Sequence, residues 1–565
     1  MELQSLIYLF VGVSFTIYFG LALWTRASST KDFYIAKNTF HPIFGGASIA
    51  VDFISAVTFI SLSGAFLSYG YGSIAYIIGL IGGFVLLSTL IIPYLHKAQF
   101  LSIPSFFEKR YYSKSIKVIS IFIVVLISFI YISAQLKGVG IIFSRIFQLD
   151  LTTGLLLGMC ITLIYAFIGG MRNMAYAQIA QYIIILFAFM TPAIFLTIQF
   201  TTTFLPQLAI FSKTSFALSN TVQEGTHLLL AFEQVLDDLG FIPNSDLNLL
   251  NTVLITMSLI LGVACLPHII IKFFSNPTVK SARKSAFWAL VFISVIYTSM
   301  LSIFAISTLN IVENTNNIEY EAFINDEIKT QDNKINSGKW LTIWQNIGLV
   351  KFEDNNQNGI IDLKSGENNF GELNINPDAI ALLNTEIANL PNWIIALVLA
   401  GALAATLSTI TGLILLIKTT ISYELLEQNL KTNKINKVLL SKLIIIIIIV
   451  LATLFYIPNF TILQTVAVAF TICAATIFPT LFLGIFYKRT NKQGAIFGIL
   501  TGLIFTLIYS IICLYMNENF IFNIRVEGIG FLGAIFNFIV TIIVSKFTSK
   551  PPKDVDEFVD FIRLT

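Results

Sequence analysis

The stretch PIFGGASIAVDFISAVTFISLSGAFL, residues 42–67, places one carboxylate, Asp52, inside a long apolar segment. A charged side chain at the centre of a membrane-spanning helix costs roughly 3 kcal/mol unless a cation or a polar partner compensates it. The same stretch is rich in glycine, serine and threonine, which favour contact with other helices over contact with lipid. The sequence therefore predicts a helix that faces the protein interior, with Asp52 at an ion or substrate site.

The composition of the whole chain is that of an integral membrane protein. Of its 565 residues, 56% are hydrophobic and 12% are charged, and the mean hydropathy is +0.82. The four histidines are scattered, and no Ser/His/Asp, paired-carboxylate or metal-ligand pattern stands out, so we do not expect an enzyme. The four cysteines lie in apolar runs, where a thiol behaves as a small hydrophobic group. We expect a transporter whose partners are lipid and a small molecule, with no nucleic acid.

Apolar segments long enough to cross the bilayer as helices recur along the chain. A window of about 19 residues predicts 13 spans, near 4–24, 42–67, 72–95, 115–147, 151–170, 174–200, 249–274, 285–311, 392–417, 438–457, 460–487, 494–516 and 527–546. The first lacks a preceding basic residue and a small-residue cleavage site, which favours a retained helix over a signal peptide.

The positions of the basic residues predict the orientation. With the N-terminus outside, most of the 34 lysines and arginines fall in the cytoplasmic loops and tail, as the positive-inside rule requires. We therefore expect a multi-pass protein of a bacterial inner membrane with its C-terminus in the cytoplasm.

Two long connections fall on the outer side and divide the chain. Residues 201–248 predict a short surface helix around 223–239, and residues 312–390 carry 13 acidic residues against five lysines, which indicates a solvated outer domain or cap. The predicted regions are 1–41 (extra helix and inner loop), 42–200 (first repeat), 201–248, 249–311 (start of the second repeat), 312–390, 391–487 (rest of the second repeat), 488–546 (two C-terminal helices) and 547–565 (tail).

One segment of the acidic insertion resembles an EF-hand calcium loop. Its candidate oxygen ligands occupy positions 1, 3, 5 and 9 of the pattern and are Asp354, Asn356, Asn358 and Asp362. Gly359 stands where the loop needs its sharp turn, but position 12 is a serine and not the usual glutamate. The alternatives are a Ca²⁺ site and an Asx-rich turn.

Two predicted spans carry the signals of broken helices. Transporters expose main-chain groups at such breaks to hold ions and small anions. The second span contains Gly45, Gly46, Asp52 and Thr58, and the seventh contains GVACLPH, in which Pro267 removes a backbone donor. A simple kink is the alternative reading of each span taken alone. The candidates for the substrate or ion path are Asp52, Gly45, Gly46, Thr58, Gln135, Gly262 and Pro267.

The ninth span offers hydroxyl groups on one helix face. Ala405, Ser408 and Thr409 are spaced i, i+3 and i+4, so two hydroxyls and a carbonyl can converge on one small cation. Bonding of the hydroxyls to the preceding turn is the alternative.

Several strings together resemble the sodium:solute symporter family, and in detail its cation/acetate symporter branch. They are GGASIAVDFISAVTFISLSGAF (45–66), LSIPSFFEKRYYS (101–113), YISAQLKGVGIIFSRIF (131–147), YAFIGGMRNMAYAQIAQYIIILFAFM (165–190), LPHIIIKFF (266–274), VKSARKSAFWA (279–289) and FPTLFLGIFYKRTNKQGAIFGILTG (478–502). The insertion 312–390 is longer than the corresponding loop of typical acetate permeases, which leaves the substrate open.

The resemblance implies an all-α leucine-transporter-like fold, with two inverted five-helix repeats in spans two to six and seven to eleven. It also implies a Na⁺ site between the second and ninth spans, formed by the carbonyls of Val51, Ile54 and Ala405 and the hydroxyls of Ser408 and Thr409. For Asp52 a nearby electrostatic role is favoured over direct ligation.

The implied function is sodium-coupled import of a small, acetate-like monocarboxylate by alternating access. The alternatives are another substrate of the family (proline or another amino acid, a sugar, pyruvate or lactate) and a transporter-like sensor, for which the tail after residue 546 is short.

Overall fold

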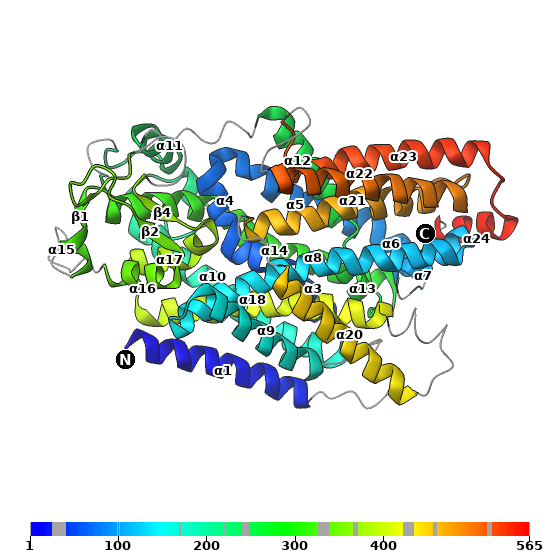
Figure 1. Ribbon diagram of the computed structural model, residues 1–565, viewed down its shortest axis with the longest axis horizontal. Helices are drawn as coiled ribbons and strands as arrows, with labels where there is room; N and C mark the ends of the chain where they lie inside the picture. Colours follow the sequence, from blue (N-terminus) through cyan, green and yellow to red (C-terminus); the bar gives the residue numbers. More distant parts are fainter. Residues whose placement is uncertain are drawn as a thin grey trace.

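The computed structural model is almost entirely helical (Figure 1). It describes residues 2–24, 41–98, 100, 102–168, 171–217, 222–239, 248–325, 338–364, 371–421, 434–455, 460–516 and 523–563.

The long helices account for most of the predicted spans. They are α1 (Leu3–Trp24), α8 (Lys114–Phe147), α9 (Leu151–Ile168), α10 (Met171–Phe200), α14 (Val279–Thr315), α18 (Asn392–Thr419), α20 (Lys434–Leu454), α21 (Ile462–Phe486), α22 (Lys492–Met516) and α23 (Ile529–Phe547). Shorter helices complete the bundle: α3 (Pro42–Phe53), η1 (Val57–Ser61), α4 (Leu62–Tyr69), η2 (Gly70–Ser73), α5 (Ile74–Leu86), η3 (Leu87–Ile91), α6 (Ile92–Ala98), α7 (Ile103–Tyr111), α12 (Leu249–Val263) and α13 (Pro267–Phe273).

The structure gives fewer membrane-spanning helices than the hydropathy window predicts. Among the described residues, nine helices are long and apolar enough to cross a membrane, or ten if the bent pair α12 and α13 is one span. One of these nine runs from Val57 to Ala98, and its 42 residues would extend about twice the thickness of the hydrocarbon. Gly70 interrupts it with φ 52°, so two predicted spans lie in this one segment. Three further apolar helical stretches are shorter than 18 residues: Pro42–Phe53, Leu151–Tyr165 within α9 and Lys442–Leu454 within α20. The number of 13 spans therefore remains a prediction.

Both helix breaks lie where the sequence places irregular spans. The break in the seventh span lies between Val263 and Pro267, where the two helices are bent by 40°, and proline has no N–H to continue the helix. The break in the second span, between Phe53 and Val57, contains neither glycine nor proline. There Ser55 Oγ accepts a hydrogen bond from the backbone N–H of Val57, and Gln135 Oε1 accepts one from Ala56. Side chains therefore satisfy donors that the helix has released.

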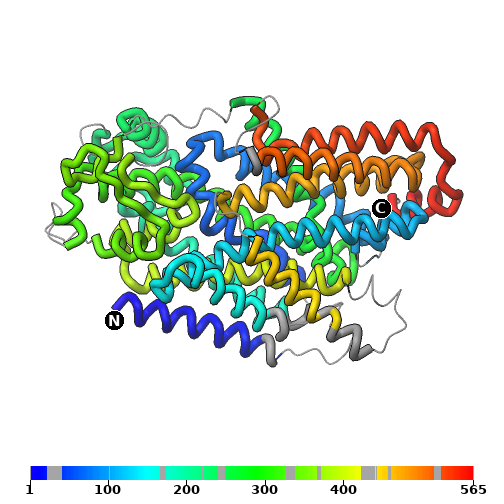
Figure 2. Tube along the Cα trace, in the orientation of Figure 1, coloured from blue at the N-terminus to red at the C-terminus, as the bar shows by residue number. Residues whose placement is uncertain are grey.

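The centre of the bundle is formed by α18 and α21, nearly all of whose residues are buried. Helix α18 packs on α10, α8, α1 and α3, while α22 and α23 pack on one another and on α21. Helix α1 lies at the edge of the bundle (Figure 2). Exposed leucine, isoleucine and phenylalanine side chains on α8, α10, α22 and α23 give these helices an apolar outer surface suited to lipid.

The acidic insertion forms a small folded cap, defined here as residues 312–390, at one end of the molecule (Figure 1). It contains α15 (Tyr320–Ile324), α16 (Lys339–Ile347), η5 (Pro377–Ala379) and α17 (Ile380–Ile387). Strand β1 (Ile318–Glu319) pairs antiparallel with β3 (Ile360–Ile361), and β2 (Val350–Phe352) pairs antiparallel with β4 (Leu373–Ile375).

The remaining short elements are η4 (Ala209–Phe211), α11 (Leu228–Asp238) and α24 (Lys553–Arg563). Helix α11 lies within the range 223–239 in which the sequence predicts a short helix, and it begins five residues later than that range. The N-terminus lies at the same end of the molecule as the cap, and α24 lies at the other end (Figure 1).

The sequence suggests that the whole cap is solvated, and the structure corrects this. The last part of the cap is inserted among the membrane helices. Asp378 is fully buried, accepts hydrogen bonds from Ser61 Oγ and from the backbone N–H of Ile462, and forms an ion pair of 2.9 Å with Lys137 on α8. Eight residues further on, Glu386 forms a second buried pair, of 2.7 Å, with Arg145. A negatively charged side chain at the N-terminus of α21 also matches the positive end of the helix dipole.

Replacement of Asp378 by alanine should destabilise the protein by about 3–5 kcal/mol, because Lys137 would keep a buried charge without its carboxylate. The matched control is Lys488→Ala, which breaks an exposed pair with Asp560 and should cost at most about 1 kcal/mol. The melting temperatures of the two detergent-purified variants measure the difference. Equal losses would show that the Asp378 pair does not anchor the cap.

Candidate cation and substrate site

Helix α3 packs against α18 at Gly412. A Cβ atom built on Gly412 would lie 2.6 Å from Asp52 Oδ2, so any larger residue there would displace the carboxylate. Asp52 and the neighbouring Ser408 and Thr409 are all fully buried. The glycine at 412 therefore allows an acidic side chain of α3 to lie directly against α18.

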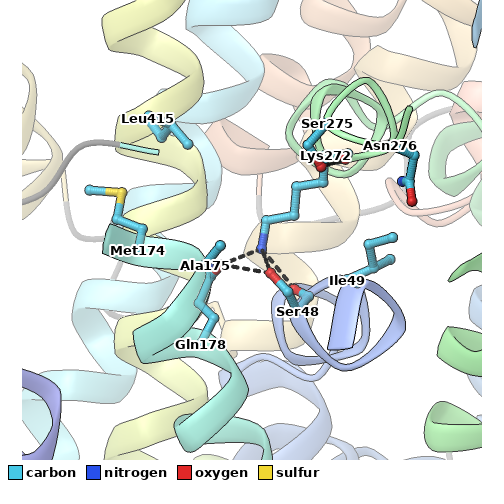
Figure 3. Close-up of a pocket in the computed structure, with 10 residues that line it drawn as sticks. Ser48, Ile49, Met174, Ala175, Gln178, Lys272, Ser275, Asn276 and Leu415 are labelled. Atoms are coloured by element: carbon cyan, nitrogen blue, oxygen red, sulfur yellow. Dashed lines mark hydrogen bonds between the residues drawn. The ribbon is translucent and has the colours of Figure 1, made fainter. Parts of the chain in front are cut away.

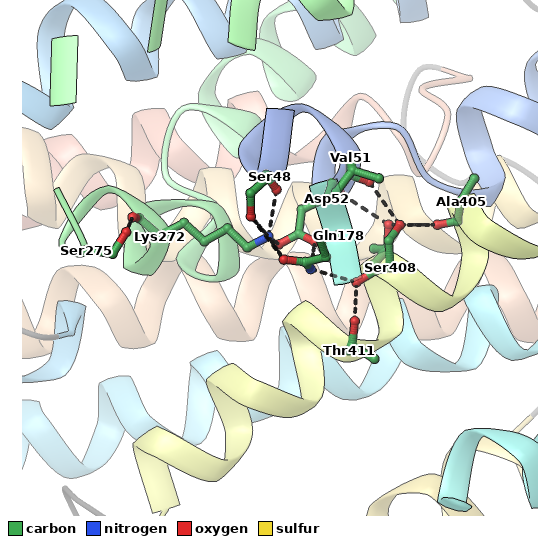
Figure 4. Close-up of polar contacts among 10 residues, drawn as sticks. Ser48, Val51, Asp52, Gln178, Lys272, Ser275, Ala405, Ser408 and Thr411 are labelled. Atoms are coloured by element: carbon green, nitrogen blue, oxygen red, sulfur yellow. Dashed lines mark hydrogen bonds and ion pairs between the residues drawn. The ribbon is translucent and has the colours of Figure 1, made fainter. Parts of the chain in front are cut away.

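Five oxygen atoms gather at this contact (Figure 4). Ser408 Oγ lies 3.0 Å from the Val51 carbonyl and 2.8 Å from the Ala405 carbonyl. Thr409 Oγ1 lies 3.2 Å from the Asp52 carbonyl and 3.3 Å from the Ala405 carbonyl. We call these five oxygens the oxygen cluster. Of the residues expected at a Na⁺ site, the structure brings Val51, Ala405, Ser408 and Thr409 together.

The expected contribution of Ile54 differs from what the structure shows. Ile54 is the buried C-cap residue of α3, and the carbonyl in contact with Thr409 is that of Asp52. The difference amounts to two residues, within the last turn of a helix that ends at Phe53. A sequence comparison has no means of fixing this register, because the break carries no glycine or proline.

The Asp52 carboxylate is occupied by two side chains that sequence reasoning did not include in the site. Its Oδ2 lies 2.5 Å from the Lys272 ammonium, and its Oδ1 accepts a hydrogen bond of 2.5 Å from Gln178 Nε2. Gln178 Nε2 also lies 3.3 Å from the Ser408 carbonyl. The available signal for Lys272 was its position within LPHIIIKFF, a cation surrounded by apolar residues at a broken helix.

The Lys272 ammonium lies at the centre of a compact polar network. Besides Asp52, it donates to the Ser48 carbonyl at 2.7 Å and to Gln178 Oε1 at 2.6 Å. These partners belong to α3 and α10, and Lys272 itself belongs to α13 (Figure 4). The network therefore joins three helices beside the oxygen cluster of α3 and α18.

A small pocket of about 30 Å³ opens onto this network (Figure 3). Its walls include Gly45, Ser48, Gln178, Lys272 and Asn276. A volume of this size holds about one water molecule.

The two glycines of α3 are contact positions between helices. A Cβ on Gly45 would lie 2.8 Å from Ser285 Oγ, and one on Gly46 would lie 2.6 Å from the Trp288 Cβ. Both neighbours belong to α14. The glycines therefore allow α3 and α14 to pack closely, and Gly45 also forms part of the pocket wall.

A second polar group lies around the helix breaks. Gln135 Oε1 accepts a hydrogen bond from the backbone N–H of Ala56, while Gln135 Nε2 is buried without a hydrogen-bond partner among the described residues. Both ring nitrogens of buried His268, which follows Pro267, likewise lack a partner among those residues. The His268 ring packs against Tyr131, one helical turn from Gln135 on α8. Buried polar atoms normally find partners, so these side chains are candidates for contact with a ligand.

The other predicted path residues have different surroundings. Thr58 shares a hydrogen bond of 2.8 Å with the Tyr297 hydroxyl. Gly262 allows α12 to contact α21, since a Cβ there would lie 2.4 Å from the Phe470 carbonyl. Pro267 begins α13 and is buried.

The proposed calcium loop is not supported. Asp354 accepts hydrogen bonds from the backbone N–H groups of Asn358 and Gly359, and Asn356 and Asn358 also accept bonds within the loop. These are the contacts of an Asx-rich turn. Among the described residues, no group of three or more His, Cys, Asp or Glu could hold a metal ion; Ser365 lies outside those residues.

Comparison with known proteins gives consistent results. An uncharacterized symporter of Cupriavidus necator is 26% identical, over 98% of this chain and 93% of its own length. An uncharacterized symporter of Bacillus subtilis is 23% identical, over 86% of this chain and 81% of its own. The fold resembles that of a Na⁺-coupled sialic acid symporter in a substrate-bound outward-open state, with a TM-score of 0.66 and 14% identity over 97% of this chain and 98% of that one.

The model of the sodium:solute symporter family matches residues 33–328 and 370–502, leaving out most of the cap. With so much of its length matched, and with the symporter fold around the buried polar centre, the chain belongs to the sodium:solute symporter family.

Proposed function

We propose that the protein is a symporter that uses a sodium gradient to import a small monocarboxylate such as acetate by alternating access. The observation that carries the proposal is the oxygen cluster between α3 and α18, which lies beside a helix break. Main-chain carbonyls released at broken helices are the groups with which many transporters coordinate Na⁺.

The proposed Na⁺ ligands are the carbonyls of Val51, Asp52 and Ala405 and the hydroxyls of Ser408 and Thr409. Each hydroxyl lies within 3.3 Å of two of these carbonyls, and both hydroxyls contact the Ala405 carbonyl, so the five oxygens form one continuous chain of contacts. Rotation of the hydroxyl hydrogens would turn oxygen lone pairs toward a bound cation. All five are neutral oxygens, which are the ligands suited to a hard cation.

The proposed coupling follows from which helices the cation joins. A cation bound between α3 and α18 would hold the broken second span against the buried centre of the bundle and favour the outward-open state. If sodium raises the affinity for the substrate, the substrate must raise the affinity for sodium by the same factor. The arrangement of spans two to six and seven to eleven as inverted repeats, and the outside location of the cap and the N-terminus, belong to this proposal.

The proposed site for the substrate carboxylate lies between the two breaks. Gln135 Nε2 provides two N–H groups, and neutral His268 provides one; all of these lack partners among the described residues. Tyr131 packs against both His268 and Phe470, so the surroundings are aromatic and closely packed. An unpaired donor set in an apolar, crowded site suits a small anion with a short apolar part.

Uptake of labelled acetate into proteoliposomes should follow an inward sodium gradient and should be abolished when choline replaces sodium. A proton gradient imposed without sodium is the parallel measurement. Uptake driven by the proton gradient alone would contradict sodium coupling. If neither gradient drives acetate uptake, competition with proline, sugars, pyruvate and lactate distinguishes the other candidate substrates.

The double variant Ser408→Ala/Thr409→Val should raise the sodium concentration for half-maximal uptake at least tenfold, because two of the five proposed oxygen ligands are removed. Thr411→Val is a matched control on the same helix, since the Thr411 hydroxyl bonds the Ser408 carbonyl and is not in the cluster. An unchanged sodium dependence in a folded double variant would refute the assignment.

Gln135→Glu keeps an oxygen for the Ala56 N–H but places a negative charge at the proposed carboxylate site. We expect the acetate concentration for half-maximal uptake to rise at least tenfold through like-charge repulsion. Stabilisation of the purified protein by sodium should persist, and it serves as the folding control. Normal acetate affinity in this variant would exclude Gln135 from the substrate site.

A further inference from the structure

We propose that Lys272 is a built-in counter-cation, which neutralises Asp52 and thereby sets the sodium affinity of the neighbouring oxygen cluster, with Gln178 as the positioning residue of the pair. The inference rests on the proposed sodium-coupled function. It assigns to Asp52 an indirect role, in which its carboxylate acts through charge and not as a sodium ligand.

The contacts of the Lys272 ammonium leave it no N–H group to donate to a substrate. An ammonium group has three N–H donors, and Lys272 has three short contacts, with Asp52, the Ser48 carbonyl and Gln178 Oε1, between 2.5 and 2.7 Å. Its residue is only 7% exposed. The cation is therefore engaged entirely by the protein and not poised to bind a substrate carboxylate.

The carboxylate of Asp52 is also held within the protein, although its Oδ2 takes part only in the ion pair and accepts no hydrogen bond among the described residues. One oxygen faces Lys272 and the other faces Gln178 Nε2, and Asp52 has no exposed surface. The main-chain carbonyl of this residue nevertheless belongs to the oxygen cluster. A change in the net charge of the pair would therefore act on a cation bound at the cluster over a short distance, and because both groups are buried, solvent would screen it only weakly.

Gln178 links the ion pair to the cluster. Its Oε1 accepts hydrogen bonds from Lys272 and from Ser48 Oγ, while its Nε2 donates to Asp52 and lies 3.3 Å from the Ser408 carbonyl. The reverse orientation of the amide would turn its NH₂ group toward the ammonium and its oxygen toward the carboxylate. The charges on both sides therefore fix the amide, which in turn holds the two charged groups in position.

The charges of the whole network are balanced. Asp52 and Lys272 carry opposite charges, whereas Ser48, Gln178, Ser408 and Thr409 are neutral. Loss of one charge leaves the other uncompensated, and loss of both restores neutrality. The double loss distinguishes a counter-charge from a sodium ligand. If Asp52 acts through its charge, removing the Lys272 charge as well restores sodium binding. If Asp52 is a ligand, removing Lys272 cannot replace it.

The test is a charge cycle on the full-length protein. Asp52→Asn, Lys272→Met and the double variant are purified in detergent, and the sodium concentration for half-maximal thermal stabilisation is measured with choline chloride holding the ionic strength constant. Lys488→Ala, which removes an exposed cation, is the control and should match the parent protein.

We expect Asp52→Asn to raise the half-maximal sodium concentration at least tenfold, because the Lys272 charge is then uncompensated beside the cluster. The double variant should return to within threefold of the parent value, and Lys272→Arg, which keeps the charge, should remain close to it. A double variant as weak as Asp52→Asn would overturn the proposal and make Asp52 a direct ligand.

A second rescue experiment tests Gln178. It replaces the Asp52→Asn/Lys272→Met double variant if variants that lack Lys272 do not fold. In Asp52→Asn/Gln178→Glu the carboxylate moves to another partner of the same ammonium, so sodium affinity should recover at least fivefold over Asp52→Asn alone. No recovery in a folded protein would overturn the proposal. An absence of any sodium-specific stabilisation or sodium-driven uptake in the parent protein would instead refute the proposed function itself.

Discussion

The structure depends on one constraint: polar groups released inside an apolar helical bundle must find partners within the protein. At the second span, the break frees backbone N–H groups, and the side chains of Ser55 and Gln135 accept their hydrogen bonds. At the seventh, Pro267 removes a donor and Lys272 follows one and a half turns later. The ammonium then returns to α3, where it bonds the Ser48 carbonyl and pairs with Asp52. The two breaks are thus joined by one polar network, and the candidate cation site lies against it.

Much of the fold could be predicted from the sequence because the relevant signals are local. Hydropathy located the long helices, and Pro267 marked the bend between α12 and α13. The spacing of Ala405, Ser408 and Thr409 placed them on one helix face, and the structure shows that face against α3. These features need only the chain nearest to them. The number of spans differs, since helix length and apolar character give nine or ten among the described residues, where hydropathy predicts 13.

What the sequence could not supply was long-range pairing. Lys272 lies near the end of the predicted seventh span with no partner evident in the sequence, yet in the structure it is buried against a residue 220 positions earlier in the chain. Asp378 and Glu386 appeared as part of a solvated acidic cap, but both are buried against basic residues of α8. The calcium prediction failed for a related reason, because the side-chain oxygens of Asp354 and its neighbours accept hydrogen bonds from backbone N–H groups of their own turn. A charge acquires its partner only when distant helices are brought together.

The cap consists of two parts of different character. The family model passes over residues 329–369 and resumes at residue 370, shortly before the buried anchors Asp378 and Glu386. The anchors therefore belong to the part of the chain that this family model describes, whereas α16, β2 and β3 form an appended module. That module joins its flanks through short strand pairs, β1 with β3 and β2 with β4. Such an arrangement would let the module change in size and charge while the helix ends beneath it keep their packing.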